Sequence, residues 1–242
     1  LATLESRGDL RRVREPVHPD LESTALCQQV LRADGPALLM HQPVGSPHAL
    51  LGNLFGSRRR IEAVLGGRPL ASLRELGKLL ASIREPRWPG SLRDALSHWP
   101  ELAQLAHVAP RTVRDAAFDE IVLEGDEVDL GRLPIQRCWP GDVGRLITFG
   151  LVVTRGTRQA RQNVAVYRQQ VLDHHRLIMR WLPHRGGALD FADFRAARPG
   201  EKFPVLVAIG ADPATMLAAV APIPDSLSEY EFAGLLRASR TR

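Results

Sequence analysis

The fold of this chain is decided by residues 161–190, which read RQNVAVYRQQVLDHHRLIMRWLPHRGGALD. Asn163–Val171 is rich in Val and contains Tyr, and Leu177–Leu182 is apolar apart from one Arg, so both segments favour β-strands. Asp173–His175 lies between them and supplies residues that are common in turns. The stretch therefore predicts a hairpin of two strands.

The predicted hairpin carries polar side chains among its apolar residues, where a polar group must find a partner or cost stability. These side chains are Asn163, Arg168, Arg180, His184 and Arg185. Three guanidinium groups with an amide and an imidazole favour an anionic ligand, most simply a phosphate. Because Asn163 and Arg168 have odd spacing, an unbroken strand would place them on opposite faces. A bulge or bend is therefore expected near Ala165–Tyr167.

The pattern of predicted secondary structure changes at about Phe118. Helical and apolar strand patterns mix in residues 1–112, whereas short strands predominate afterwards, which predicts an α+β protein with domains at 1–112 and 113–242. The expected helices start after the N-caps Asp20, Ser57 and Asp212, or cover Leu73–Leu80, Ser91–His107 and Ala188–Arg198. The expected strands are Pro36–Met40, Leu50–Leu54, Glu120–Leu123, Leu133–Ile135, Leu146–Thr154 and Phe203–Ile209.

Composition favours a soluble cytoplasmic protein. Apolar residues make up 44% of the 242 and charged residues 24%, which is ordinary for a globular chain. No apolar run approaches the roughly 18 residues of a membrane span, and the charged start is unlike a signal peptide. The arginines are scattered, which argues against nucleic-acid binding, although a net charge of +5 suits weak peripheral contact with an anionic membrane. Cys27 and Cys138 fit neither a disulfide framework nor a metal motif.

Specific segments follow one another in a recognisable order along nearly all of the chain. They are GPALL, GNLFGS and LRELGKLLA in the first third, LPIQRCWPGD and LITFGLVVTRG before the hairpin, and RQNVAVYRQQV, IMRWLPHRGGALDF, FPVLVAIGADPAT and PIPDSLSEYEFAGLLR from the hairpin onward. Together these resemble the UbiD family of decarboxylases, most closely the branch acting on 3-polyprenyl-4-hydroxybenzoate in ubiquinone biosynthesis. The resemblance implies that residues 113–242 form a flavin-binding split β-barrel, incomplete at its C-terminal end, after a mixed α/β N-terminal domain.

The resemblance also implies an activity. Such a carboxy-lyase performs non-oxidative decarboxylation of an aromatic acid, here 3-polyprenyl-4-hydroxybenzoate to 2-polyprenylphenol, with prenylated FMN. The catalytic arginine of the family corresponds to Arg168, placed to hold the substrate carboxylate. Cofactor contacts correspond to Val166, Tyr167, Arg168, Arg180, Trp181, Leu182, Arg185 and Gly186. Metal ligands correspond to Asn163, His184 and Glu229, which suit Mn²⁺ or Mg²⁺, with K⁺ alongside.

Structural roles stay open for the same residues. Ser226 and Glu229 have the spacing of a helix capping box. Asn163 can satisfy a strand end, His184 can lie in a turn after Pro183, and Trp181 can pack in the core.

The acids that reprotonate the product in this family lie beyond Arg242, so the resemblance implies a fragment, inactive alone, of a longer homo-oligomeric enzyme. Its expected partners are the aromatic acid and a flavin prenyltransferase that supplies the cofactor. Two other functions fit parts of the sequence: an FMN-binding split-barrel module of flavin-reductase type, and a non-catalytic assembly domain. A prenyl adduct on the extracted flavin would distinguish the decarboxylase from the reductase module.

Overall fold

The structure is a computed structural model, and it describes residues 1–84, 108–114, 120–158, 161–224 and 227–241. The chain packs into two compact units, each assembled from separate stretches. Unit 1 comprises residues 1–63, 115–148 and 167–180, and unit 2 comprises residues 64–114, 149–166 and 181–242. The domain boundary expected between residues 112 and 113 stays a prediction, and the helix expected over Ser91–His107 lies outside the described residues.

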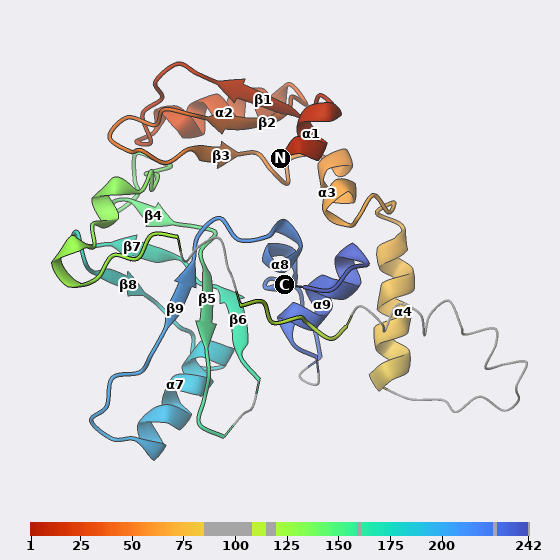
Figure 1. Cartoon of the computed structure of the whole chain (residues 1–242), viewed down its shortest axis with the longest axis vertical. Helices are drawn as coiled ribbons and strands as arrows, with labels where there is room; N and C mark the ends of the chain where they lie inside the picture. The colour runs from red at the N-terminus through yellow and green to blue at the C-terminus, as the bar shows by residue number, and fades with distance from the viewer. Residues whose placement is uncertain (85–107, 115–119, 159–160, 225–226, 242) are drawn as a thin grey trace, which may run out of the picture. The chain divides into compact units, whose positions relative to one another are not determined.

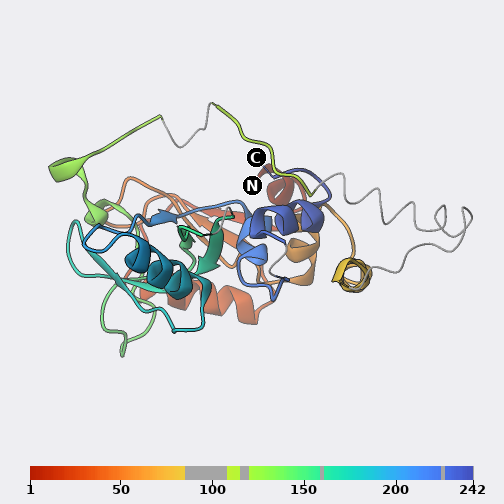
Figure 2. The same ribbon diagram turned by 90° about the horizontal axis from the view of Figure 1, so that it is seen from below.

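Unit 1 begins with a three-stranded sheet. Its strands are β1 (Leu10–Val13), β2 (Ala37–Met40) and β3 (Leu50–Gly52), in the order β1-β2-β3. β1 and β2 run parallel, which requires a crossover, and α2 (Glu22–Arg32) supplies it. Figures 1 and 2 place α2 against one face of this sheet, where a side chain at Gly52 would collide with the sulfur of Cys27. The strands expected near residues 36–40 and 50–54 are therefore confirmed.

The core of this part of unit 1 is aliphatic. It forms where α1 (Ala2–Ser6) meets the sheet and contains the buried residues Leu4, Leu10, Ala37 and Leu39. The helix predicted after Ser57 is present as α3 (Arg58–Val64), and the Ser57 hydroxyl accepts a hydrogen bond from the Arg60 backbone N–H at 3.3 Å.

A second, antiparallel sheet completes unit 1. Its strands are β4 (Leu146–Ile147), β7 (Gln169–Val171) and β8 (Leu177–Met179), in the order β4-β7-β8. The Asp173 carboxylate accepts hydrogen bonds from the backbone N–H groups of His175 and Arg176, at 3.0 and 2.9 Å, and so closes the turn between β7 and β8. The predicted hairpin is therefore confirmed, although β8 ends before Leu182.

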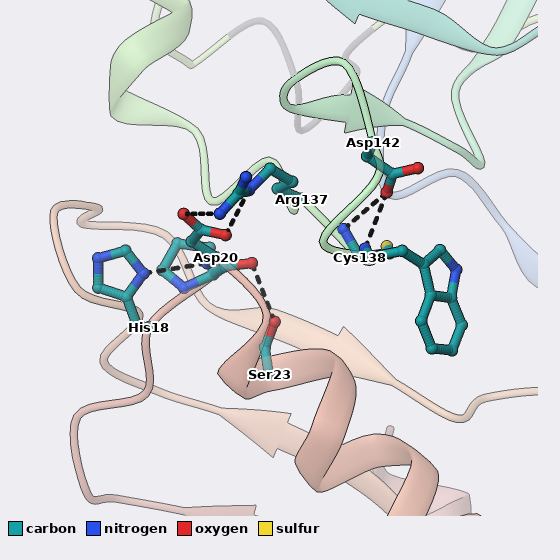
Figure 3. A network of polar contacts seen from close by, with 8 residues as sticks. His18, Asp20, Ser23, Arg137, Cys138 and Asp142 are labelled. Carbon is teal, nitrogen blue, oxygen red and sulfur yellow. Dashed lines mark hydrogen bonds and ion pairs between the residues drawn. The ribbon is translucent and has the colours of Figure 1, made fainter.

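A polar network joins the start of α2 to residues 136–142 within unit 1 (Figure 3). The Arg137 guanidinium donates to both carboxylate oxygens of Asp20, at 2.7 and 3.1 Å, and Gln136 donates to the Ser23 hydroxyl at 2.8 Å. The expectation that Asp20 caps α2 is wrong, because its carboxylate is taken by Arg137 and the N-cap position falls on Leu21. The same guanidinium lowers the pKa of the Asp20 carboxyl below its usual range.

Unit 2 is built on a third sheet. Its strands are β5 (Leu151–Thr154), β6 (Asn163–Val166) and β9 (Leu206–Ala208), in the antiparallel order β6-β5-β9. The helix α7 (Gly186–Ala197) packs beside β5 and β6, as Figure 1 shows. An aromatic cluster of Trp181, Phe191, Phe194 and Phe203, with neighbouring ring centroids 5.1–6.0 Å apart, attaches α7 to the segments on either side of it.

Three further helices belong to unit 2. They are α4 (Ser72–Arg84), α8 (Pro213–Ala218) and α9 (Glu229–Arg237). The predicted N-cap of α8 is confirmed, since the Asp212 carboxylate accepts from the Thr215 backbone N–H at 3.0 Å. The C-terminal end of α9 is held by Arg68, whose guanidinium donates to the carbonyl oxygens of Leu235 and Leu236.

Two predicted strands are each interrupted by a change of sheet. The segment expected as one strand over 163–171 forms β6 and then β7, which lie in different sheets, with the break at Tyr167 and Arg168. The expected interruption is thus present, immediately after β6. The apolar run 146–154 divides in the same way into β4 and β5. β4 pairs with β7 in one sheet, and β5 pairs with β6 in another. Both runs of sequence therefore pass from one of these sheets to the other.

The mixed helix-and-sheet class predicted from the sequence is confirmed. The strands expected at 120–123 and 133–135 are wrong, since neither segment joins a strand ladder among the described residues. In the described part of the chain, none of the three sheets closes into a barrel. No described helix is long and apolar enough to cross a bilayer.

Candidate metal and cofactor site

The site begins where β5 and β6 end together. Thr154, the last residue of β5, pairs in register with Asn163, the first residue of β6, so their side chains are cross-strand neighbours. The Asn163 amide nitrogen donates to the Thr154 hydroxyl at 3.1 Å. That hydroxyl in turn donates to the Asp190 carboxylate at 2.6 Å. Thr154 and Asp190 are only 2% and 5% exposed, so this hydrogen-bonded chain is shielded from water.

The N-terminal turn of α7 closes one side of the site. Gly186 is the first residue of α7, and a Cβ atom there would overlap the Asn163 amide oxygen. The helix can approach the strand this closely only because residue 186 lacks a side chain. The sequence pattern suggested that Gly186 and Gly187 end the hairpin region before a helix at Ala188, whereas the helix starts at Gly186 itself.

Glu229 reaches the same strand end from α9. Its carboxylate accepts a hydrogen bond from the Val164 backbone N–H at 3.3 Å. The capping box of α9 is formed by Ser228 and Glu231, with hydrogen bonds of 2.7 and 3.2 Å, so Glu229 is not used to cap the helix. The structure therefore brings Glu229 and Asn163, which are far apart in the sequence, to one end of β6.

The electrostatics of this strand end favour a cation. Burial raises the pKa of the Glu229 carboxyl above its usual value, and the negative charge of Asp190 adds to the rise. The Val164 N–H and the positive charge of Arg161 oppose it. The carboxylates of Glu229 and Asp190 repel each other, Arg161 acts in the opposite direction on Glu229, and a divalent cation would offset the repulsion further.

The donor set fits a hard divalent ion. An amide oxygen and a carboxylate are ligands of the kind that Mg²⁺ and Mn²⁺ take, with phosphate oxygens and water completing the shell. Among the described residues no group of three or more His, Cys, Asp and Glu side chains has a metal-binding arrangement, so Asn163 and exogenous oxygens would have to contribute. His184 is exposed, and no hydrogen bond or ion pair joins it to the described residues around Asn163. Its assignment as a third ligand stays a prediction.

The residues assigned to the flavin are divided between the two units. Unit 2 holds Val166, Trp181, Leu182, Arg185 and Gly186, and unit 1 holds Tyr167, Arg168 and Arg180. Arg185 occupies the N-cap position of α7 and is exposed, as Arg168 and Arg180 are in unit 1. Trp181 packs on Phe191 and Phe203, so it does have the core-packing role that the sequence offered as an alternative. The flavin contacts themselves stay predictions.

Sequence reasoning missed Thr154, Asp190 and Arg161 as members of this site. A threonine closing an apolar strand and an aspartate in a helix usually face solvent. The one usable signal was that Asp190 and Asp193 lie about one helical turn apart on α7, in a segment that also carries Phe191 and Phe194.

Two family profiles match the sequence. The N-terminal domain of 3-octaprenyl-4-hydroxybenzoate carboxy-lyase, called UbiD_N, matches residues 1–80. The 3-octaprenyl-4-hydroxybenzoate carboxy-lyase Rift-related domain, called UbiD, matches residues 111–242.

Solved structures of UbiD-class enzymes resemble the fold. HmfF from Pelotomaculum thermopropionicum in complex with FMN is 27% identical with a TM-score of 0.73, over 99% of this chain and 48% of that one. An evolved dimeric form of HmfF in complex with prFMN is 28% identical with a TM-score of 0.74, over 99% and 50%. Vanillic acid decarboxylase from Sedimentibacter hydroxybenzoicus, in open form, is 24% identical with a TM-score of 0.77, over 99% and 47%, and this likeness is evidence for the fold alone.

The chain thus spans about half the length of these relatives. The Rift-related profile alone covers more than half of this chain, and the N-terminal profile of the same enzyme family precedes it. On these grounds the chain belongs to the UbiD family.

Proposed function

We propose that this chain forms the cofactor-holding part of a non-oxidative aromatic-acid decarboxylase, a carboxy-lyase that works with prenylated FMN and a divalent metal. The observation that carries the proposal is the convergence of Asn163 and Glu229 at one end of β6, with Asp190 close by. Two similar UbiD-class structures contain FMN and prFMN, which supports the choice of cofactor.

In this proposal the prenylated flavin, when bound, stabilises the electron pair that remains as carbon dioxide departs. Asn163 and Glu229 would hold Mn²⁺ or Mg²⁺ through oxygen atoms, His184 would complete the protein ligands, and K⁺ would lie alongside. The metal would anchor the phosphate tail of the flavin. Arg185, at the N-cap of α7 in the same unit as Asn163 and Glu229, would donate hydrogen bonds to this phosphate, since guanidinium groups form two parallel bonds to such anions.

Arg168 is proposed to hold the carboxylate of the substrate. It is exposed in the two-residue break between β6 and β7, where its backbone is free of a strand ladder. A guanidinium is well suited to binding a carboxylate and to orienting it for cleavage.

The fold, the substrate and the cellular setting complete the proposal. The strands of residues 113–242 would belong to a flavin-binding split barrel. The substrate would be 3-polyprenyl-4-hydroxybenzoate, converted to 2-polyprenylphenol in ubiquinone biosynthesis, in keeping with the resemblance of the segments around the hairpin to that branch. A flavin prenyltransferase would supply the cofactor, and the full-length enzyme would be a cytoplasmic homo-oligomer in peripheral contact with the membrane that holds its substrate.

Glu229→Gln tests the metal-bridged site, with Glu231→Gln as a matched control. Both residues lie in the first turn of α9, but only Glu229 approaches β6. Protein is produced together with a flavin prenyltransferase, and its manganese and extracted flavin are measured by elemental analysis and mass spectrometry. Glu229→Gln is expected to lose metal and flavin together, while Glu231→Gln is expected to keep both.

The control variant keeps the capping box, because glutamine also serves at its third helical residue, so its folding stability is expected to stay near that of the wild type. Thermal denaturation therefore distinguishes a loss of stability from a loss of metal. If flavin stays bound to Glu229→Gln after the metal has gone, the bridging role of the metal is wrong.

A further inference from the structure

Thr154 and Asp190 form a hydrogen-bonded chain with Asn163 whose direction is fixed. An ionised carboxylate only accepts hydrogen bonds, and a threonine hydroxyl has a single proton to donate. The 2.6 Å distance between Thr154 Oγ1 and Asp190 Oδ2 is typical of a strong hydrogen bond to a charged acceptor, so the proton of Thr154 goes to Asp190. Thr154 then has only lone pairs to offer to Asn163.

This direction decides which way the Asn163 amide faces. The oxygen and nitrogen of a side-chain amide have nearly the same shape, so packing alone barely distinguishes the two orientations. Thr154 can only accept from Asn163, so it takes the amide nitrogen, at 3.1 Å. The amide oxygen is thereby turned away from Thr154 and toward the first residue of α7, Gly186.

The burial of the chain makes this orientation firm. Thr154 is 2% exposed and Asp190 is 5% exposed, so water does not replace a lost partner at either residue. A buried polar group without a partner is unfavourable, so reversing the amide alone would leave two acceptors facing each other or a carboxylate without its donor.

From this geometry we propose that Thr154 and Asp190 are positioning residues, which hold the Asn163 amide with its oxygen available to a divalent cation. The inference rests on the metal site of the proposed function and adds to it the groups that orient one ligand. Such supporting residues typically change metal affinity by about 10–100-fold when they are replaced.

Four variants of this chain test the inference. Asp190→Asn can donate to Thr154, which frees the Thr154 hydroxyl to donate to Asn163 and allows the amide to turn its nitrogen toward the cation. Thr154→Val removes the hydroxyl but keeps the charge of Asp190, so a change in that variant is not due to lost charge. Thr154→Ser keeps the hydroxyl and is expected to bind metal as the wild type does.

Asp193→Asn is the matched control for the helix. Asp193 lies one turn after Asp190 on α7, and it accepts hydrogen bonds from Thr157 and Arg158 at 2.9 Å rather than from the Asn163 pair. It should therefore leave metal affinity unchanged while altering the loop that follows β5.

The measurement is Mn²⁺ titration in the presence of FMN, followed by the electron paramagnetic resonance signal of free Mn²⁺. Circular dichroism gives the folded fraction, and each affinity is calculated per folded molecule. Asp190→Asn and Thr154→Val are expected to raise the Kd for Mn²⁺ by about 10–100-fold, with Thr154→Ser and Asp193→Asn at the wild-type value.

Two negative results have different meanings. If the wild-type chain binds no Mn²⁺, the metal site of the proposed function is refuted and the inference with it. If the wild type binds Mn²⁺ and both Thr154→Val and Asp190→Asn bind it equally well, the metal site stands and the positioning role is refuted.

Discussion

Replacing Gly186 with alanine tests how closely α7 approaches the Asn163 amide. A Cβ atom at residue 186 would overlap the amide oxygen and lie 2.7 Å from the amide carbon, a separation at which something must move. Overpacking of this kind costs about 1–3 kcal/mol, and the better helix propensity of alanine returns at most about 1 kcal/mol. Because the overlap is severe, the upper part of that cost range applies, about 2–3 kcal/mol, and the expected net loss is about 1–2 kcal/mol. For a chain of this size each kcal/mol lowers Tm by roughly 2–4 °C, so Gly186→Ala should melt about 2–8 °C lower.

Gly77→Ala is the control, because Gly77 lies in α4 with no atom within 4 Å of the added methyl group. It should raise stability by about 0.5–1 kcal/mol through helix propensity alone. Both variants are measured by thermal denaturation followed by circular dichroism, and Mn²⁺ affinity is measured for Gly186→Ala. A Gly186→Ala protein that melts at or above the wild-type temperature and binds Mn²⁺ normally would show that the contact with Asn163 is not tight.

Two further predictions concern charged residues of unit 1. Arg168→Ala in the full-length parent should abolish decarboxylation and leave the flavin bound. The control Arg176→Ala, which alters an exposed arginine paired with Asp173, should leave turnover intact. Unchanged turnover in Arg168→Ala would show that Arg168 takes no part in the reaction. Because Arg137 lowers the folded-state pKa of Asp20, their pairing stabilises the fold above the usual pKa of an aspartate and is lost as the pH falls through the lowered value. Denaturant midpoints of the wild type should therefore fall more steeply with acid than those of Asp20→Asn, and parallel profiles would contradict the pairing.

The sequence was most informative where spacing alone restricts geometry. Asn163 and Arg168 are five residues apart, so one unbroken strand would place their side chains on opposite faces. The strand does end between them, immediately after β6. The turn at Asp173 was also predictable, because a short acidic side chain there can accept from the next backbone N–H groups.

Other features depend on tertiary contacts that spacing does not encode. The apolar run 146–154 has no internal signal strong enough to divide it, yet β4 and β5 separate because their partners β7 and β6 separate. Around α9, two serines and two glutamates offer overlapping capping boxes. Only the packing of α9 against β6 makes Glu231 the capping residue and leaves Glu229 for the strand.

Thr154 and Asp190 were invisible for a related reason. A hydroxyl and a carboxylate indicate a positioning role only when both are buried and hydrogen-bonded to each other. That arrangement requires β5 and α7 to meet. Their proposed role follows from which group donates each hydrogen bond, from Asn163 to Thr154 and from Thr154 to Asp190, and the residue types alone do not reveal it.

The contact between α2 and residues 136–142 also bears on how this chain can be divided into shorter pieces. A cut between the two family profiles, after residue 80 and before residue 111, looks natural on paper. Unit 1, however, contains residues from both sides of that cut, and the Arg137 guanidinium donates a hydrogen bond to the Asp20 carboxylate across it. An isolated N-terminal piece would keep its own sheet but expose the beginning of α2 to water. The boundary between the two profiles therefore does not coincide with a boundary of unit 1, which contains residues from both of them.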